Sequence, residues 1–197
     1  MVSTNCMLII NDETKEALII DPGNDADKIA QAITKLDCQP VAILLTHGHF
    51  DHVMAVDKIR DKYSIPAYLY EDEEELLGNA ILNHSAKYGI PYQTKADKLV
   101  TDNQKLCLAG INIEVIHTPG HTSGCCCYYL PDEATLISGD TLFYGTVGRT
   151  DFETSSGAAM RESIKRLLSA LPEDVQVLPG HGDPTTIGHE KRYNPFA

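Results

Sequence analysis

The sequence predicts an α/β fold in a single domain that spans residues 1–197. Apolar runs that suit strands alternate with segments in which apolar residues recur at helical spacing. The length is enough for one sizeable hydrophobic core but short for two separate domains. Polar residues gather where several of the predicted strands end, so we expect one edge of a sheet to carry the functional residues.

Strand and helix signals follow each other along the chain. Apolar runs bounded by turn residues predict strands at 7–10, 17–21, 41–46, 67–70, 106–109, 111–116, 125–130, 134–139 and 175–178. The run at 41–46 is apolar without alternation, which is typical of a strand covered on both faces. Apolar residues at helical spacing predict helices at 25–37, 52–62 and 157–170.

The acidic stretch EDEEELL at 71–77 predicts the start of a further helix. Acidic side chains are favourable at the positive N-terminal end of a helix dipole. We therefore interpret this cluster as a solvated helix start rather than as a metal site.

Six cysteines bear on the cellular compartment. Three of them, Cys125, Cys126 and Cys127, are consecutive, a pattern that suits a buried strand better than a disulfide framework. The N-terminus has no basic segment before its apolar run, so no secretory signal is expected. These observations predict reduced thiols in a cytoplasmic protein.

The composition limits the classes of partner. A formal net charge of −12 repels phosphate backbones, so nucleic acid is not expected as a partner. No apolar run reaches the roughly 18 residues needed to cross a bilayer, so no membrane partner is expected. We expect a small-molecule substrate, and a chain that is a monomer or a homodimer.

Four polar clusters each follow an apolar strand. THGHFDH at 46–52 follows VAILL, TPGHTSG at 118–124 follows IEVIH, SGDTLF at 138–143 follows TLI, and LPGHGD at 178–183 follows VQVL. Glycines within the clusters allow tight turns and a close approach of the backbone to a ligand. The candidate metal ligands in these clusters are His47, His49, Asp51, His52, His121, Asp140 and His181.

The types of these residues indicate metal binding. Neutral imidazole and carboxylate groups are ligands for zinc and similar divalent metals. A single histidine is usually a surface or core residue, but four such clusters in one chain favour a metal site. Seven candidates exceed the needs of one ion. We therefore expect two divalent ions, zinc first, with iron or manganese as alternatives and with Asp140 available to bridge them.

The same motifs carry a family resemblance. THGHFDH, TPGHT, SGDTLF and LPGHG together resemble the metallo-β-lactamase superfamily, in its glyoxalase II-like branch, over nearly the whole chain. The resemblance implies a four-layer αββα sandwich with the metal site at one edge between two mixed sheets. It also implies one metal on His47, His49 and His121, a second on Asp51, His52 and His181, and Asp140 as the bridge.

Three features separate the chain from other branches of this superfamily. Secreted β-lactamases commonly carry Cys where Asp140 stands and need export, so antibiotic hydrolysis is not expected. The net charge disfavours the RNase Z-like branch. The chain ends soon after His181, so we expect no C-terminal helical domain of the kind that helps glyoxalase II to bind glutathione. GDTLFYGTVGRTDF and TTIGHEKRYNPF instead resemble short, single-domain bacterial hydrolases of this branch.

The resemblance implies hydrolysis of an S-acyl thioester, with S-lactoylglutathione as the reference substrate of the family. Two adjacent cations would lower the pKa of a water held between them, and the resulting hydroxide would attack the thioester carbonyl. The cations would also stabilise the developing oxyanion. Asp51 and Asp140 are the expected catalytic residues, because Asp51 can orient the hydroxide and Asp140 can bridge the metals.

Two residues are candidates for substrate binding. Arg149 aligns with a glutathione-contacting lysine of glyoxalase II and could pair with a substrate carboxylate. The alternative is a structural loop with an internal pair between Arg149 and Asp151. Tyr144 is either a wall of the substrate pocket or a packed loop residue. Three further histidines are expected to be packing or rim residues rather than ligands, namely His84, His117 and His189.

Two alternatives to the hydrolase remain open. Persulfide dioxygenases share this fold and most of these motifs, but they use one iron held by the residues that match His47, His121 and Asp140. The other alternative is a non-catalytic metal-binding protein. The identity and number of the bound metals distinguish the hydrolase from the dioxygenase. The effect of metal removal on activity tests whether the protein is non-catalytic.

Overall fold

The computed structural model describes residues 3–197, and the chain divides into two compact units. Unit 1 runs to Val100 and includes Cys107–Ile111, and unit 2 comprises Thr101–Leu106 and Asn112–Ala197. The single domain expected over 1–197 stays a prediction. Among the helices of the described residues, none combines the length and the apolar character needed to span a membrane.

The sheet of unit 1 has the strand order β1-β2-β3-β4-β5. Its strands are β1 (Met7–Ile10), β2 (Glu16–Ile20), β3 (Gln39–Leu44), β4 (Ala67–Tyr70) and β5 (Lys98–Val100). The first two strands form the predicted antiparallel hairpin, and the later pairs are parallel. Parallel neighbours need crossover connections, which contain the helices of this unit.

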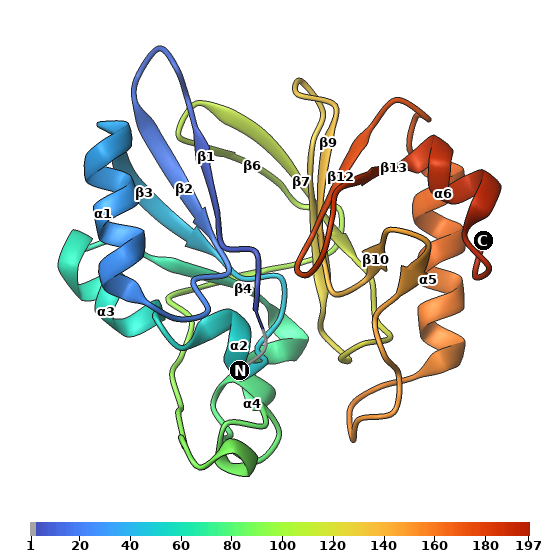
Figure 1. Ribbon diagram of the computed structural model, residues 1–197, viewed down its shortest axis with the longest axis horizontal. Coiled ribbons are helices and arrows are strands. Elements are labelled where there is room, and N and C mark those ends of the chain that lie inside the picture. The colour runs from blue at the N-terminus through green and yellow to red at the C-terminus, as the bar shows by residue number, and fades with distance from the viewer. Residues whose placement is uncertain (1–2) are drawn as a thin grey trace. The chain divides into compact units, whose positions relative to one another are not determined.

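Two helices of unit 1 pack on this sheet, α1 (Ala26–Leu36) and α3 (Val56–Tyr63), both in blue to teal in Figure 1. Ile33 of α1 and Ile59 of α3 join Ile43 and Leu69 of the strands in one buried cluster. Helical spacing places the apolar side chains of each helix in one stripe that faces the sheet. Shorter helical turns follow β3 and β4, namely α2 (Phe50–Val53), η1 (Glu71–Glu73), α4 (Glu74–Leu77) and η2 (Ala86–Tyr88).

The second sheet has the order β13-β12-β9-β8-β7-β6. Its strands are β6 (Lys105–Leu108), β7 (Ile111–His117), β8 (Cys126–Leu130), β9 (Thr135–Gly139), β12 (Gln176–Pro179) and β13 (Thr185–Thr186). β8 is antiparallel to both β7 and β9, and β12 is parallel to β9. Consequently β7, β9 and β12 run in one direction, and their carboxyl ends lie at the same edge of the sheet.

Unit 2 also contains two helices and a small hairpin. The hairpin joins β10 (Leu142–Phe143) to β11 (Thr146–Val147), and the helices are α5 (Gly157–Ala170) and α6 (Ile187–Tyr193), in orange and red in Figure 1. Ile164 and Leu167 of α5 pack with Cys127 and Val177 of the sheet in a buried cluster. The side chain of Ser156 caps α5 by accepting a hydrogen bond from the Ala159 amide.

The longer predicted elements are confirmed, with one correction to a helix. The helix predicted at 52–62 is interrupted, because α2 ends at Val53 and α3 begins at Val56. The Ala55 amide donates to the Pro22 carbonyl at 2.9 Å. This amide therefore makes no hydrogen bond within a helix, and the helix is interrupted there. The strands β5, β10, β11 and β13 were not predicted, since two or three residues are too few for a recognisable pattern.

The three consecutive cysteines form part of the core, as the sequence predicts. Cys125, Cys126 and Cys127 are all buried, and β8 begins at Cys126. The Cys125 thiol donates to the Thr118 carbonyl at 2.9 Å. Burial raises the pKa of the Cys127 thiol to about 12, so this thiol stays protonated at neutral pH and is no thiolate ligand.

Candidate metal centre

Unit 1 carries four of the predicted ligands on the segment that follows β3. The strand ends at Leu44, and the chain turns into the short helix α2. The ligands are His47, His49, Asp51 and His52, and the three histidines among them are buried. The ring centroid of His47 lies 4.8 Å from that of His49 and 4.2 Å from that of His52. The structure therefore brings these side chains together within one unit.

Asp21 orients the imidazole of His52. Its carboxylate follows the end of β2 and is buried. Oδ2 of Asp21 lies 2.9 Å from Nδ1 of His52, and because a carboxylate only accepts, this ring nitrogen carries the proton. The lone pair of the neutral ring is then on Nε2, which lies 3.9 Å from Asp51 Oδ2. His52 thus has its lone pair on Nε2, the atom with which the ring would bind a metal.

Thr46 extends this network to His47. The Thr46 amide donates to Asp21 Oδ1 at 2.8 Å, and its hydroxyl donates to Asp21 Oδ2 at 2.6 Å. Since the hydroxyl has only one proton, it accepts from Nδ1 of His47, which lies 3.1 Å away. One buried carboxylate therefore sets the tautomer of two ligand histidines, and both present Nε2.

The prediction that the acidic stretch at 71–77 is a solvated helix start is wrong for Glu73. Glu73 is fully buried and accepts a hydrogen bond from the Gly48 amide at 3.0 Å, while the neighbouring acidic side chains are exposed. The carboxylate thereby holds the backbone between His47 and His49. The ring of His84 lies at a centroid distance of 5.1 Å from that of His49, so this predicted rim residue packs against a predicted ligand.

Unit 2 carries the other three predicted ligands at one edge of its sheet. His121 follows β7, Asp140 follows β9 directly, and His181 follows β12. Because these strands run in one direction, the three residues meet at their carboxyl ends. His121 and Asp140 are buried, whereas the side chain of His181 is 24% exposed.

Asp140 lies at equal distances from the two histidines of its unit. Its Oδ2 is 3.4 Å from His121 Nε2 and 3.4 Å from His181 Nε2. Two ligand atoms on a tetrahedral zinc with bonds of about 2.0–2.1 Å are separated by about 3.3–3.4 Å. The geometry therefore fits an oxygen that shares a metal with either histidine, as a bridging carboxylate must.

Backbone atoms hold the ligands of unit 2. The Arg149 carbonyl lies 3.0 Å from Nδ1 of His121 and accepts a hydrogen bond from it, so this ring also presents Nε2. Gly148 allows the segment before Arg149 to lie against Asp140, because a Cβ on it would lie 1.9 Å from the Asp140 carbonyl oxygen. The Ser155 hydroxyl donates to the His121 carbonyl at 2.6 Å and holds the other side of the loop.

The donor chemistry of both units fits divalent metal ions. All seven predicted ligands are imidazole or carboxylate groups, which zinc, iron and manganese accept. In three of the histidines an oxygen acceptor faces Nδ1, an arrangement common for metal-bound imidazole. The chain therefore has the donor set of a metal-binding protein, while the partition of the ligands between two ions stays a prediction.

The two predicted substrate residues are exposed and have partners within unit 2. The Arg149 guanidinium donates two hydrogen bonds to the Asp151 carboxylate, at 2.6 and 2.7 Å, and lies 4.3 Å from the Phe152 ring centroid. This is the internal ion pair of the structural-loop alternative. The Tyr144 ring stacks on His189 with centroids 4.8 Å apart. A role for Arg149 or Tyr144 in substrate binding stays a prediction.

Sequence reasoning missed the residues that orient the ligands. Asp21 carried a usable signal, since it follows an apolar strand as the ligands do. Thr46 stood inside a recognised motif, but nothing in the sequence paired it with Asp21. Glu73 carried no signal, because its burial depends on a tertiary contact with the Gly48 amide.

Comparison with known proteins groups this chain with metal-dependent enzymes. A family model described as the metallo-beta-lactamase superfamily matches residues 1–181. "Probable metallo-hydrolase YqgX" of Bacillus subtilis is 41% identical over 197 residues, which cover 99% of this chain and 92% of the relative. "Hydroxyacylglutathione hydrolase GloC" of Haemophilus influenzae is 37% identical over 198 residues, with 98% and 92% covered.

Solved structures share the fold. The crystal structure of BLEG-1 B3 metallo-beta-lactamase matches with a TM-score of 0.93 and 43% identity, covering 98% of this chain and 93% of that chain. The crystal structure of TTHA1623 in a di-iron-bound form matches with a TM-score of 0.88 and 37% identity, covering 98% and 95%. These matches confirm the predicted α/β fold class of the metallo-β-lactamase type.

Proposed function

The chain belongs to the metallo-beta-lactamase superfamily and is a metal-dependent hydrolase, and from this premise we propose that its substrates are thioesters. The proposed substrate is an S-acylglutathione such as S-lactoylglutathione, or a related acyl-thiol. The choice of a thioester rests on the relative described as a hydroxyacylglutathione hydrolase, which is 37% identical along nearly the whole chain.

We further propose that the two ligand sets hold one pair of divalent ions, with zinc as the first candidate. Asp140 is the proposed bridge, because one of its oxygens lies at the same distance from two histidines. The proposed partition places His47, His49 and His121 on one ion and Asp51, His52 and His181 on the other. When bound, the ions supply a water of lowered pKa and a positive field for the oxyanion.

Asp51 and Asp140 are the proposed catalytic residues. Oδ2 of Asp51 accepts a hydrogen bond from the Thr4 hydroxyl at 3.4 Å, which limits rotation of the carboxylate. A carboxylate held in this way can orient an attacking water by accepting one of its protons. The leaving thiolate is stable in water, so the chain does not need a strong general acid beside the scissile bond.

The cellular context is part of the same proposal. The buried, consecutive thiols of β8 belong to the core and fit a reducing compartment. We therefore propose a cytoplasmic location with a small-molecule partner. A monomeric or homodimeric state stays a prediction that size-exclusion chromatography with light scattering can check.

The direct test is hydrolysis of S-lactoylglutathione by the zinc-loaded protein, followed through the thioester absorbance. We expect turnover, and we expect Asp140→Ala to lower kcat by at least about 100-fold, because it removes a charged group that acts at the reacting centre. Asp183→Ala is the matched control, since Asp183 is an exposed carboxylate in the loop of His181. A fully metallated sample that hydrolyses no thioester would overturn the proposal.

A β-lactam is the second candidate substrate. The specific observation in its favour is the 43% identity to a structure described as a B3 metallo-beta-lactamase. A β-lactam amide and a thioester both pass through a tetrahedral oxyanion, so one site can act on either. The same zinc-loaded sample should therefore be assayed on a chromogenic β-lactam. A kcat/KM that exceeds those of all thioesters would replace the thioester proposal with this one.

A further inference from the structure

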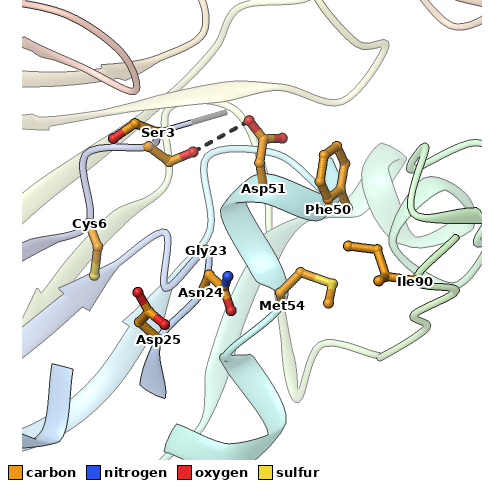
Figure 2. Close-up of a pocket in the computed structure, with 10 residues that line it drawn as sticks. Ser3, Cys6, Gly23, Asn24, Asp25, Phe50, Asp51, Met54 and Ile90 are labelled. Carbon is orange, nitrogen blue, oxygen red and sulfur yellow. Dashed lines mark hydrogen bonds between the residues drawn. The ribbon is translucent and has the colours of Figure 1, made fainter. Parts of the chain in front are cut away.

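Unit 1 has a pocket of about 300 Å³ whose lining includes Asp51. Figure 2 shows Phe50, Met54 and Ile90 on one side of this pocket, and Asn24 and Asp25 on the other. All the residues that line it belong to unit 1. The pocket therefore adjoins a proposed catalytic residue.

One wall of the pocket is apolar. Phe50 begins α2, and its ring stacks on Tyr88 with centroids 4.7 Å apart and an interplanar angle of 30°. Met54 follows α2 directly and adds a flexible thioether, which adapts to irregular ligands. Ile90 is 40% exposed. An exposed branched side chain in the lining of a pocket offers apolar area that a ligand can still bury.

The opposite wall is rich in hydrogen-bond acceptors and contains no cationic side chain among the described lining residues. Asp25 accepts a hydrogen bond from Lys28 at 2.7 Å, but Lys28 itself does not line the pocket. Thr4 donates its hydroxyl proton to Asp51. A negatively charged group at the far end of a ligand would therefore meet oxygen atoms on this wall and no side-chain cation.

We propose that this pocket binds the acyl chain of the thioester and selects an uncharged chain of medium length. The inference rests on the proposed hydrolase function, which places the thioester carbonyl beside Asp51. At about 30 Å³ for each non-hydrogen atom, a volume of about 300 Å³ holds about ten such atoms. A lactoyl group fills half of that space at most, whereas a hexanoyl group can reach the apolar wall.

The two walls together set the selectivity. Each methylene that is fully buried against Phe50, Met54 and Ile90 should raise the affinity about fourfold. A terminal carboxylate on the acyl chain, directed away from the metal-bound carbonyl, would lose water without gaining a side-chain cation, which disfavours its entry. The pocket should thus prefer butyryl and hexanoyl thioesters over both the shorter acetyl and the charged succinyl thioester.

The test uses the zinc-loaded full chain and four thioesters of N-acetylcysteamine that carry these acyl groups. We expect kcat/KM to rise at least about tenfold from acetyl to hexanoyl, because several methylenes become buried. We expect the succinyl thioester to react at least about tenfold more slowly than the butyryl thioester. Equal kcat/KM values along the series would overturn the pocket assignment and leave the hydrolase standing.

Substitution of Ile90 locates the effect in the pocket. Ile90→Ala should lower kcat/KM for the hexanoyl thioester about three- to tenfold and leave the acetyl thioester within about twofold, since only the long chain reaches this wall. Ile81→Ala is the matched control, because Ile81 is 73% exposed in the same unit and does not line the pocket. An equal loss on both thioesters with Ile90→Ala would contradict the proposal.

A second readout does not depend on turnover. The ketone analogue of the hexanoyl thioester, in which a methylene replaces the sulfur, cannot be cleaved. Its titration should shift the methyl NMR signal of Met54, identified through Met54→Leu, and the succinyl analogue should not. If no thioester is hydrolysed, the hydrolase proposal fails, but this NMR shift still tests whether the acyl chain binds in the pocket. An unmoved Met54 signal at saturating analogue would overturn the acyl-chain assignment.

Discussion

The ligands of unit 1 and those of unit 2 are held in different ways. In unit 1, the side chains of Asp21 and Thr46 orient His52 and His47 through a buried hydrogen-bond network. In unit 2, a backbone carbonyl orients His121, and the chain reaches it only because Gly148 has no side chain. Changes of side-chain chemistry should therefore impair unit 1, whereas added volume on the backbone should impair unit 2.

The largest effect is expected from Gly148→Ala. The new Cβ would lie 1.9 Å from the Asp140 carbonyl oxygen, so the backbone of the ligand loop must move. Overpacking against backbone costs about 3 kcal/mol or more when nothing flexible can yield. We expect a loss of unfolding free energy of about that size, and a loss of bound metal, measured by urea unfolding and by elemental analysis.

Gly145→Ala is the control for this prediction. Gly145 has a positive φ, of 66°, which Gly148 does not, and a Cβ on Gly145 would meet nothing within 4 Å. Its substitution should cost only about 1–2 kcal/mol of backbone strain and leave the metal content unchanged. Should both variants unfold at the same urea concentration, close packing of Gly148 is not what holds the ligands.

The next largest effect is expected from Asp21→Asn, which tests whether the side-chain network of unit 1 orients its histidines. The amide keeps the size of the carboxylate but loses its charge and part of its accepting capacity toward Thr46 and His52. We expect unfolding free energy to fall by about 1–3 kcal/mol and zinc affinity to fall about 10–100-fold. Urea unfolding of the metal-free protein and competition with a zinc chelator measure the two effects.

Asp27→Asn serves as the matched variant, because Asp27 is an exposed carboxylate on α1. It should change neither stability nor zinc affinity measurably. If Asp21→Asn destabilised the fold but bound zinc as tightly as the unaltered protein, Asp21 would be a purely structural residue. The proposed orientation of His52 would then be wrong.

The smallest effect on stability is expected for Arg149→Ala. The pair with Asp151 is exposed on both sides, and such pairs contribute about 0–1 kcal/mol. If Arg149 binds the substrate carboxylate, its removal should raise KM for a glutathione thioester about three- to tenfold, as the loss of one exposed ionic contact would. Asp151→Ala removes the carboxylate partner of the guanidinium and should leave KM unchanged or lower it. An unchanged KM in both variants would assign the pair to loop structure alone.

The places of the candidate ligands after strands could be predicted from the sequence, because each follows an apolar run and four of them share one segment. The residues that orient them could not. Asp21 meets His52 only because β2 and β3 pair in parallel and bring their carboxyl ends together. That pairing is a tertiary property, which no local pattern in a single sequence reports.

Unit 2 also has tertiary contacts that the sequence does not predict. The helix at 157–170 and the strands on either side could be predicted from periodicity, and the structure confirms them. The approach of Gly148 to Asp140 depends on the hairpin between β10 and β11, whose two-residue strands carry no periodic signal. Patterns thus indicated the candidate metal ligands but not the contacts that keep these residues in place.

The central claim is that both ligand sets serve one pair of metals in a thioester hydrolase. The most direct test is to measure metal content and activity on the same sample, purified without added metal. The proposed function predicts close to two metal ions per chain and turnover of S-lactoylglutathione. One iron per chain, with oxygen consumption on glutathione persulfide and no thioester hydrolysis, would contradict it.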